Sequence, residues 1–168
     1  MIELVIFDRD NTLNVDLGFT FKTESLQLMP NILEVKRWLE NNSVKFAVAS
    51  NQSGIGEGYY TENQMHNFND NLFSKIGWKY EKKIFEFCPH PRNIKPRCIC
   101  RKPSPYMLLK ICEKLSISTD RTVFIGDSET DKEAALKARI DFILINKNLG
   151  HVDTIEKLNY FNKKKLTI

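Results

Sequence analysis

Two aspartates one residue apart follow the first apolar run of the chain. Residues 4–7 are all apolar, which predicts a buried strand, and Asp8 and Asp10 come directly after it. In an open α/β sheet, ligands bind at the carboxyl ends of the strands. Two carboxylates at this place would either raise the pKa of one of them or attract a cation. A strand end with polar caps is the alternative interpretation, because an Asp-x-Asp pair alone is weak evidence for catalysis.

Predicted strands and predicted helices alternate along the rest of the chain. Apolar runs predict strands at residues 4–7, 44–49, 83–87, 123–125 and 142–145. Helices are expected from Pro30, from the capping box at residues 61–64, from an N-cap at Ser104, and over residues 128–137 and 155–161. Residues 14–29 lack periodicity and are expected to form a long loop. Five alternations predict an α/β fold with a parallel sheet, right-handed crossovers and helices on both faces.

Further polar residues follow these predicted strands. Ser50 comes after the second strand and Asp127 after the fourth, so both are expected at the same sheet edge as Asp8 and Asp10. Three carboxylates there would suit Mg²⁺, which takes one or two carboxylates together with a substrate phosphate. Lys102 would supply a fixed positive charge for phosphate oxygens, as Ser50 would supply a hydroxyl.

Asp131 lies four residues after Asp127. We expect it either to help bind the ion or to hold Lys102 in place. The alternative for Lys102 is an ordinary solvated lysine.

A cluster of soft metal ligands occupies residues 88–100. Its members are Cys88, His90, Cys98 and Cys100. Three thiols and an imidazole in one short loop suit tetrahedral Zn²⁺. The spacing is tighter than in ordinary zinc fingers, so two structural cysteines and a stray histidine are the alternative. Cys112 is expected in the core, and His66 and His151 at the surface or at caps.

The overall composition limits the class of protein. A chain of 168 residues with 42% hydrophobic residues is expected to form one domain with an adequate core. No signal peptide or membrane-spanning run is apparent, so a cytoplasmic location without disulfides is expected. The net charge is only +4, and the lysines at 163–165 are interpreted as a solvated end, which argues against a nucleic-acid partner. No membrane partner is expected either.

Four segments carry a resemblance to a known family. They are Asp-Arg-Asp-Asn-Thr at 8–12, Ser-Asn-Gln-Ser-Gly at 50–54, Arg-Lys-Pro at 101–103 and Gly-Asp-Ser-Glu-Thr-Asp at 126–131. In this order and spacing they resemble the four motifs of the haloacid dehalogenase (HAD) superfamily of phosphatases. The match runs over about residues 2–146. Within the superfamily, the chain resembles the small capless branch that contains D-glycero-D-manno-heptose-1,7-bisphosphate 7-phosphatase and histidinol-phosphate phosphatase.

The resemblance implies a fold and a mechanism. The fold would be a single Rossmann-like HAD domain over residues 1–168, with a five- to six-stranded parallel sheet, no cap domain and a zinc-binding loop. Asp8 would attack the phosphorus and form an aspartyl-phosphate, and Asp10 would serve as general acid and base. Mg²⁺ would be held by Asp8, by the carbonyl of Asp10 and by Asp127.

The resemblance also implies the substrate contacts. Lys102, Ser50 and the amide of Asn51 would neutralise the phosphoryl oxygens. The other implied substrate-binding residues are Thr12, Gln52 and Arg101. The zinc would be structural and would orient Arg101 and Lys102.

Three positions differ from the pattern of that branch. Asn11 replaces a usual glycine, but Asn tolerates positive φ, so the turn is expected to survive. Glu57 stands where a basic residue is common, and Ser128 where a lysine is frequent. The Glu57 difference raises the question of how a second substrate phosphate is held; Arg101, Arg92 and Lys95 are the candidates for that contact.

The expected substrate is a small phosphorylated metabolite, with a heptose bisphosphate as the first choice and histidinol phosphate as the second. A polynucleotide 3′-phosphatase is a more distant possibility, because the chain lacks a strong basic groove with aromatic platforms. An inactive zinc-stabilised binding module is the hypothesis of another class. A monomer is expected, as in other capless phosphatases.

Overall fold

The computed structural model describes residues 1–96 and 98–165. Residue 97 of the predicted zinc loop and residues 166–168 of the predicted domain lie outside this part. The described chain forms a five-stranded parallel sheet in the order β3-β2-β1-β4-β5, as the alternation of strands and helices predicted. Its strands are β1 (Leu4–Phe7), β2 (Lys45–Asn51), β3 (Phe85–Cys88), β4 (Thr122–Gly126) and β5 (Asp141–Leu144).

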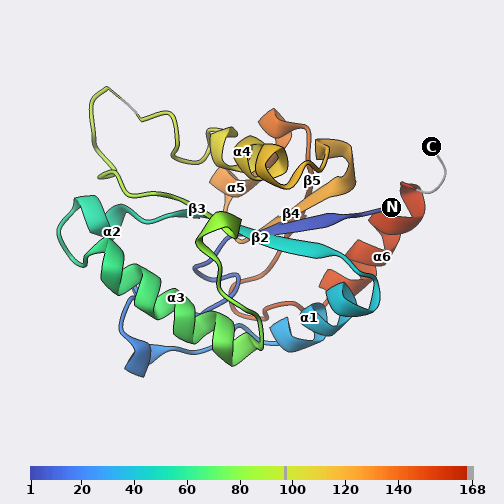
Figure 1. Ribbon diagram of the computed structural model, residues 1–168, viewed down its shortest axis with the longest axis horizontal. Helices are drawn as coiled ribbons and strands as arrows, with labels where there is room; N and C mark the ends of the chain where they lie inside the picture. Colours follow the sequence, from blue (N-terminus) through green and yellow to red (C-terminus); the bar gives the residue numbers. More distant parts are fainter. Residues whose placement is uncertain (97, 166–168) are drawn as a thin grey trace.

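Helices connect successive strands and cover both faces of the sheet (Figure 1). The α-helices are α1 (Ile32–Asn41), α2 (Ser53–Gly56), α3 (Glu62–Ile76), α4 (Tyr106–Leu115), α5 (Glu129–Ala138) and α6 (Thr154–Lys164). Three 3₁₀ turns are η1 (Thr23–Ser25), η2 (Lys82–Ile84) and η3 (Thr119–Arg121). No helix in residues 1–96 and 98–165 combines the length and the apolar character that crossing a membrane requires.

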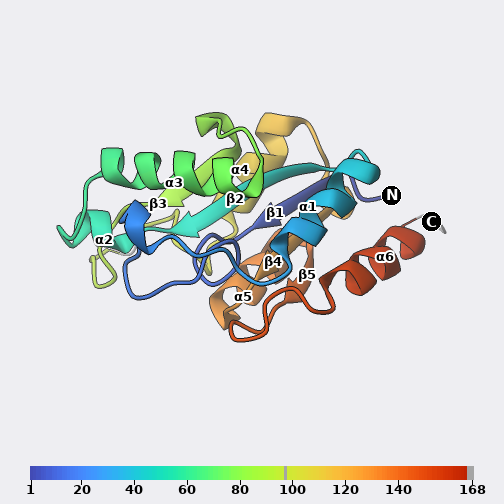
Figure 2. The same cartoon turned by 90° about the horizontal axis from the view of Figure 1, so that it is seen from below.

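Each face of the sheet has its own apolar core. On one face, Val5 and Phe7 of β1 pack with buried side chains of α1, α3 and α6. On the other face, Leu4 and Ile6 pack against α4 and α5. Figure 1 shows the sheet between these two layers, and Figure 2 looks onto the face that α1, α3 and α6 cover. Because β1 is buried on both faces, it needs the uninterrupted apolar run from which the strand was predicted.

The strand register places the polar residues at one edge. Phe7 lies opposite Val48 on β2 and opposite Ile125 on β4. Asp8 and Asp127 therefore leave the sheet at the same edge, where the loop after β3 and the short helix α2 also lie (Figure 1). The amino terminus lies at the opposite edge, beside the end of α6.

Two helix starts differ from the sequence predictions. The helix expected from Pro30 begins at Ile32, because Asn31 adopts a left-handed conformation with φ of 63° before it. The helix expected to have Ser104 as its N-cap and a proline at its first position begins one residue later, with Pro105 as the N-cap. In both places the proline precedes the helix.

Further differences concern several elements and two histidines. The short helix α2 was not predicted, and the segment 14–29, expected to be a long loop, contains η1. The third strand begins at Phe85 because the residues before it form η2. The last helix, α6, is longer than the segment 155–161 predicted for it. His66 and His151 are both buried, so the prediction of a surface position was wrong, although His151 does contact Thr154 at the start of α6.

Candidate active site

A buried lysine lies between two buried carboxylates at the carboxyl edge of the sheet. Lys102 Nζ is 2.8 Å from Asp8 Oδ1 and 2.6 Å from Asp131 Oδ1, and it donates a hydrogen bond to the carbonyl of Ala49 at 2.8 Å. Burial alone would lower the pKa of Lys102, but the carboxylates of Asp131 and Asp8 outweigh burial and hold that pKa above its ordinary value. Lys102 is therefore a permanent cation fixed in position.

The same edge holds a group of carboxylates that could bind a cation. One oxygen from each of Asp8, Asp127 and Asp131 lies within 4.8 Å of the others. Burial raises the pKa of Asp8 to about 7, with additional contributions from the charges of Asp131 and Asp10 and opposition from Lys102. Burial and the charge of Asp131 also raise the pKa of Asp127. Crowded carboxylates that are costly to ionise fit a hard divalent cation, which would stabilise their charged forms.

Asp131 is held by the start of its own helix. Ser128 is the N-cap of α5, and Asp131 Oδ2 accepts hydrogen bonds from the Ser128 amide at 3.2 Å and the Ser128 hydroxyl at 2.5 Å. Gly126 is required beside it, since a Cβ there would lie 2.7 Å from the Asp131 side chain. Asp131 therefore contacts Lys102, as one of the two alternatives from the sequence expected. It also belongs to the group of carboxylates that could hold the ion, so its part in metal binding stays a prediction.

The side chain of Asp10 points away from that group toward a buried arginine. Arg9 is fully buried, and its Nη2 donates to Asp10 Oδ1 at 2.8 Å and to the carbonyl of Thr20 at 2.8 Å. Its guanidinium lies 4.9 Å from the centre of the Phe68 ring on α3. The sequence analysis gave Arg9 no role, because an arginine between two acids has no periodic signal that would mark it as buried.

Gln52 connects Asp10 to the end of β2. Its Nε2 donates to Asp10 Oδ2 and to Ser50 Oγ, both at 2.9 Å, and its Oε1 accepts from the Tyr60 hydroxyl at 2.7 Å. Gln52 is buried, so the polar atoms of its side chain contact protein groups. Burial raises the pKa of Tyr60 to about 12, which keeps its hydroxyl protonated as the donor. The sequence analysis gave Tyr60 no role.

Asn51 and Thr12 complete the described edge. Asn51 Oδ1 accepts from the Lys102 amide at 3.0 Å and its Nδ2 donates to the Lys102 carbonyl at 3.2 Å, so Asn51 fixes the backbone that carries the lysine. Thr12 is buried, and its hydroxyl has no hydrogen-bond partner among the described residues. The Thr12 carbonyl accepts from His151 Nε2 at 2.8 Å, which ties the loop after β1 to the segment before α6.

The predicted metal loop brings its four ligands together. Cys88 Sγ lies 3.5 Å from Cys98 Sγ, and His90 Nδ1 lies 3.2 Å from Cys100 Sγ. All four ligand atoms are within 4.8 Å of one another. Tetrahedral zinc with Zn–S bonds of about 2.3 Å needs ligands roughly 3.7 Å apart, so this group of atoms fits that ion. Arg101 Nη2 donates to the carbonyl of His90, which attaches the Arg-Lys-Pro segment to the loop.

Comparisons with known proteins agree with this geometry. A family model described as "HAD-hyrolase-like" matches residues 99–165. A D-glycero-alpha-D-manno-heptose-1,7-bisphosphate 7-phosphatase from Campylobacter jejuni is 31% identical, with 96% of this chain and 97% of that protein covered. The chain belongs to the heptose bisphosphate phosphatase family of the HAD superfamily. It is a phosphatase by this membership.

A second relative by sequence and one solved structure are also similar to this HAD phosphatase. A D-glycero-beta-D-manno-heptose-1,7-bisphosphate 7-phosphatase from Helicobacter pylori is 30% identical, with 81% of this chain and 79% of that protein covered. The crystal structure of a D,D-heptose 1,7-bisphosphate phosphatase from B. bronchiseptica, complexed with magnesium and phosphate, matches with a TM-score of 0.74 and 25% identity. That match covers 85% of this chain and 80% of the other.

The structure shows what the three departures from the family pattern do. Asn11 adopts a positive φ of 56°. The turn in which the family usually has a glycine is therefore preserved with asparagine. Glu57 Oε1 accepts a hydrogen bond from the Arg92 amide at 3.2 Å, so the acid at this position contacts a basic residue of the metal loop. Ser128 serves as the N-cap described above.

A cavity of about 410 Å³ adjoins the carboxyl edge of the sheet in this HAD phosphatase. Asn51, Arg101 and Lys102 line it together with Arg92 from the metal loop and Lys137 from α5. Its volume lies within the range of about 300–1,000 Å³ that is usual for small-molecule sites. This cavity is lined by three of the predicted site residues, Asn51, Arg101 and Lys102, and is therefore the candidate for the substrate site.

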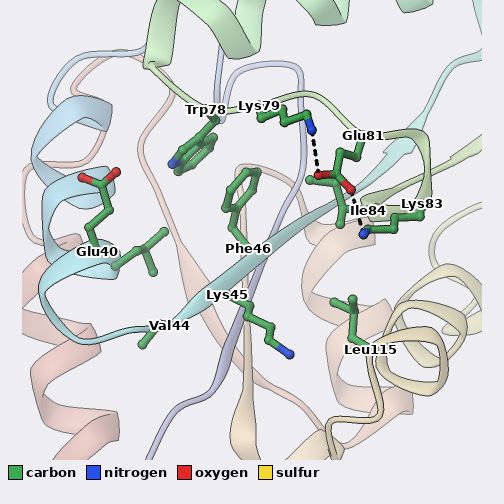
Figure 3. Close-up of a pocket in the computed structure, with 11 residues that line it drawn as sticks. Glu40, Val44, Lys45, Phe46, Trp78, Lys79, Glu81, Lys83, Ile84 and Leu115 are labelled. Carbon is green, nitrogen blue, oxygen red and sulfur yellow. Dashed lines mark ion pairs between the residues drawn. The ribbon is translucent and has the colours of Figure 1, made fainter.

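Another cavity, of about 460 Å³, lies at the amino ends of β2 and β3 (Figure 3). Phe46 and Trp78 form part of its wall, and Glu81 at its rim pairs with Lys83 at 2.8 Å. It is lined by none of the predicted site residues and it opens at the sheet edge opposite Asp8. We therefore place the site of this HAD phosphatase at the carboxyl edge and not in this larger hollow.

Proposed function

We propose that this phosphatase removes the 7-phosphate of D-glycero-D-manno-heptose 1,7-bisphosphate in a magnesium-dependent reaction. The observation that carries the proposal is the position of Lys102 between Asp8 and Asp131, beside Asp127. A cation and an anionic nucleophile in contact suit attack on a phosphate whose negative oxygens need neutralising. The identity of the sugar is inferred from the names of the relatives, which are heptose 1,7-bisphosphate 7-phosphatases.

Asp8 acts as the nucleophile. Its carboxylate attacks the phosphorus, the bond from phosphorus to the sugar oxygen breaks, and an aspartyl-phosphate forms. Asp10 gives a proton to the leaving sugar oxygen and later takes one from the water that cleaves the aspartyl-phosphate. Arg9 and Gln52 hold Asp10 in a fixed orientation for both steps.

Asp8, Asp127 and the carbonyl of Asp10 would hold the magnesium ion. When bound, the ion supplies positive charge that lets an anionic nucleophile meet an anionic substrate. The Ser50 hydroxyl, the Asn51 amide and the Lys102 ammonium neutralise the oxygens of the phosphoryl group. Arg101 and Thr12 make further substrate contacts, while Gln52 acts mainly by positioning Asp10 and Ser50.

Zinc on the four ligands of residues 88–100 has a structural role in this proposal. The ligand set is closed, with three thiolates and one imidazole, and leaves no open position for catalysis. Metal analysis of the purified protein should find one zinc per chain, and Cys98→Ser should lower that content. Cys112→Ser, which changes a buried thiol outside the cluster, serves as the matched control.

We also propose that the enzyme works as a cytoplasmic monomer within one domain. Free thiols in a metal-ligand set suit a reducing compartment. Size-exclusion chromatography with light scattering tests the oligomeric state.

A substrate panel tests the function. Phosphate release should require Mg²⁺, should be fastest with one anomer of D-glycero-D-manno-heptose 1,7-bisphosphate, and should vanish in Asp8→Asn. Both anomers belong in the panel, because the relatives named above include an alpha and a beta enzyme. Faster hydrolysis of histidinol phosphate would replace the heptose assignment. Absence of turnover with every phosphate ester would favour an inactive zinc-stabilised binding module.

A further inference from the structure

A row of polar side chains leads from the proposed general acid to the surface of α3. We call it the α3 network, and its members are Arg9, Asn69, Tyr80, His66 and Glu62. Asn69 and His66 of α3 are buried, and Tyr80 follows that helix and contacts both of them. Buried polar groups need partners, and these residues supply them for one another. The proposed chemistry uses none of the three.

The inner end of the α3 network is the guanidinium of Arg9. Its Nε and Nη2 donate to Asp10 Oδ1 at 3.0 and 2.8 Å, and its remaining nitrogen, Nη1, donates to Asn69 Oδ1 at 3.4 Å. The ring of Phe68, the residue before Asn69, lies 4.9 Å from the same guanidinium. Helix α3 therefore contacts Arg9 both at a nitrogen and across an aromatic ring, and so fixes the fork that faces Asp10.

The direction of each hydrogen bond follows from the donors present. A guanidinium only donates, so the oxygen of the Asn69 amide faces Arg9 and its nitrogen faces Tyr80. That nitrogen, Nδ2, donates to the Tyr80 hydroxyl at 3.4 Å. Burial raises the pKa of Tyr80, so the hydroxyl keeps its own proton. Among the described residues, the acceptor for that proton is His66 Nδ1, 2.5 Å away.

His66 carries the α3 network to the surface. Because its Nδ1 accepts from Tyr80, the proton of the neutral ring lies on Nε2. Nε2 is 3.4 Å from Oε1 of Glu62, an exposed acid one turn earlier on α3. Every member thus donates in the same direction, from the cation Arg9 inside to the anion Glu62 outside. Hydrogen bonds aligned in this way polarise one another, so each contact favours one orientation of the next side chain.

We propose that Asn69, Tyr80 and His66 are positioning residues, which hold Arg9 so that its fork keeps the Asp10 carboxyl oriented for proton transfer. This inference rests on the proposed function, because it needs Asp10 as general acid and base. It adds a second support for that carboxyl, on the α3 side of the sheet. Proton transfer depends on the geometry of donor and acceptor, so a slightly misplaced carboxyl slows the step that needs the proton.

The test varies how much the leaving group needs a proton. The alkoxide of an alkyl phosphate leaves with a proton from the general acid, whereas 4-nitrophenolate leaves as the anion. The measured quantity is kcat/KM for the fastest alkyl phosphate of the substrate panel divided by kcat/KM for 4-nitrophenyl phosphate, both with Mg²⁺. This ratio does not depend on the fraction of active enzyme. No member of the α3 network lines the cavity beside Lys102, so substrate contacts there stay the same in the variants.

Three substitutions each remove the polar atoms of one member and leave a side chain of similar size. The ratio should fall about tenfold in Asn69→Leu, because Asn69 contacts Arg9 directly. It should fall roughly threefold in Tyr80→Phe and in His66→Leu, which act through Asn69. The fall should come mainly from kcat for the alkyl phosphate. His66→Asn places an amide oxygen near the position of Nδ1, so it should restore the wild-type ratio.

Two matched variants control for the loss of polar atoms elsewhere. Asn71→Leu changes an exposed amide of the same helix, which donates to the carbonyl of Asn67. Tyr160→Phe removes the hydroxyl of an exposed tyrosine on α6. Neither residue belongs to the α3 network, so the ratio should stay at its wild-type value.

The outcomes separate this inference from the proposed function. An unchanged ratio in Asn69→Leu and Tyr80→Phe, even where both rates fall together, overturns the inference and leaves the proposed reaction in place. If Asn69→Leu does not fold, Tyr80→Phe decides alone, since it removes a single oxygen atom. Absence of Mg²⁺-dependent turnover with every phosphate ester overturns the proposed function and this inference together. A lowered ratio in these variants, with recovery in His66→Asn and unchanged controls, supports the inference.

Discussion

The side chains around Asp10 show how far single residues are fixed before any substrate arrives. Tyr60 donates to Gln52, and Gln52 donates to Asp10 and Ser50. An aromatic residue between α2 and α3 therefore positions the proposed general acid through one intermediate side chain. Gly54 makes room for this contact, since a Cβ there would lie 2.2 Å from the Tyr60 ring. Tyr60 is therefore a positioning residue.

Tyr60→Phe should lower kcat about tenfold with little change in KM, because the ring stays while Gln52 Oε1 loses its donor. Steady-state kinetics between pH 5 and 9 should also show a shifted profile, since Asp10 would be oriented less firmly. Tyr59→Phe is the control, because Tyr59 is largely exposed. Equal effects of the two substitutions would remove the positioning role.

The raised pKa of Asp8 makes stability depend on pH. Its pKa of about 7 in the folded state lies above the ordinary value of an aspartate, so the folded protein holds a proton that the unfolded chain releases. The stabilisation from this proton is complete at low pH and is lost as pH rises through 7. Asp8→Asn, which resembles the protonated form, should therefore be more stable than wild type at pH 8 without added Mg²⁺.

Thermal unfolding of the zinc-loaded protein measures this difference. The difference between the melting temperatures of wild type and Asp8→Asn should be smaller at pH 5 than at pH 8. Added Mg²⁺ should raise the melting temperature of wild type at pH 8 and have little effect on the variant. Asp70→Asn, at an exposed position of α3, controls for the loss of a charge. A variant less stable than wild type at pH 8 would contradict the argument.

At the level of elements, two helix caps of the same kind have different tasks. Thr61 and Ser128 each form a capping box, on α3 and α5 respectively. The cap at Ser128 also supplies two donors to Asp131, which contacts Lys102. The first cap serves only its helix, while the second serves its helix and the site.

Thr61→Ala and Ser128→Ala should each lower the free energy of unfolding by about 1 kcal/mol, the usual effect of losing an N-cap side chain. Only Ser128→Ala should also lower kcat, because Asp131 loses the donor at 2.5 Å. Urea unfolding and steady-state kinetics on both variants test this. A fall in kcat of the same size in Thr61→Ala would show that helix stability alone controls activity.

The same elements show what the sequence could predict. The apolar runs at 4–7 and 123–125 identified strands that end at Asp8 and Asp127, because a strand buried on both faces must be apolar throughout. Helix starts were less predictable, because the left-handed Asn31 and the cap at Pro105 depend on local backbone geometry. The four ligands of the metal loop came together as predicted, since their spacing limits them to one short loop.

Buried polar residues could not be predicted in the same way. Arg9 and His151 belong to types that are mostly exposed or intermediate, and only the assembled structure supplies the partners that bury them. Asp10 followed the strand as expected, but the direction of its side chain depends on Arg9 and Gln52. The positions of the acids were thus predictable from the chain, and the network that orients them was not.

On the scale of the whole molecule, His151 joins the last part of the chain to the loop that carries the proposed catalytic acids. Its Nε2 donates to the Thr12 carbonyl, and its Nδ1 lies 3.1 Å from the Thr154 hydroxyl, as in a neutral imidazole. Burial lowers the pKa of His151, although the bond to Thr12 opposes this. The unfolded chain therefore binds a proton below about pH 6.5 that the folded protein excludes.

His151→Ala should lower the free energy of unfolding by roughly 1–3 kcal/mol at pH 7.5, because the buried carbonyl of Thr12 loses its donor. The difference in the free energy of unfolding between wild type and variant should be smaller at pH 5.5. There the wild-type protein alone is destabilised, because its folded state keeps the imidazole neutral while its unfolded chain binds a proton. Urea unfolding at the two pH values measures this difference. A difference that widens on acidification would show that His151 is protonated in the folded state.

The two tryptophans lie away from the site. Trp78 stacks on Phe46 with ring centres 3.9 Å apart at the amino edge of the sheet, and Trp38 donates to Asn159 between α1 and α6. Their intrinsic fluorescence should therefore follow global unfolding and stay constant when phosphate esters bind at the opposite edge. Emission spectra can thus distinguish an inactive but folded variant from one that has lost its fold.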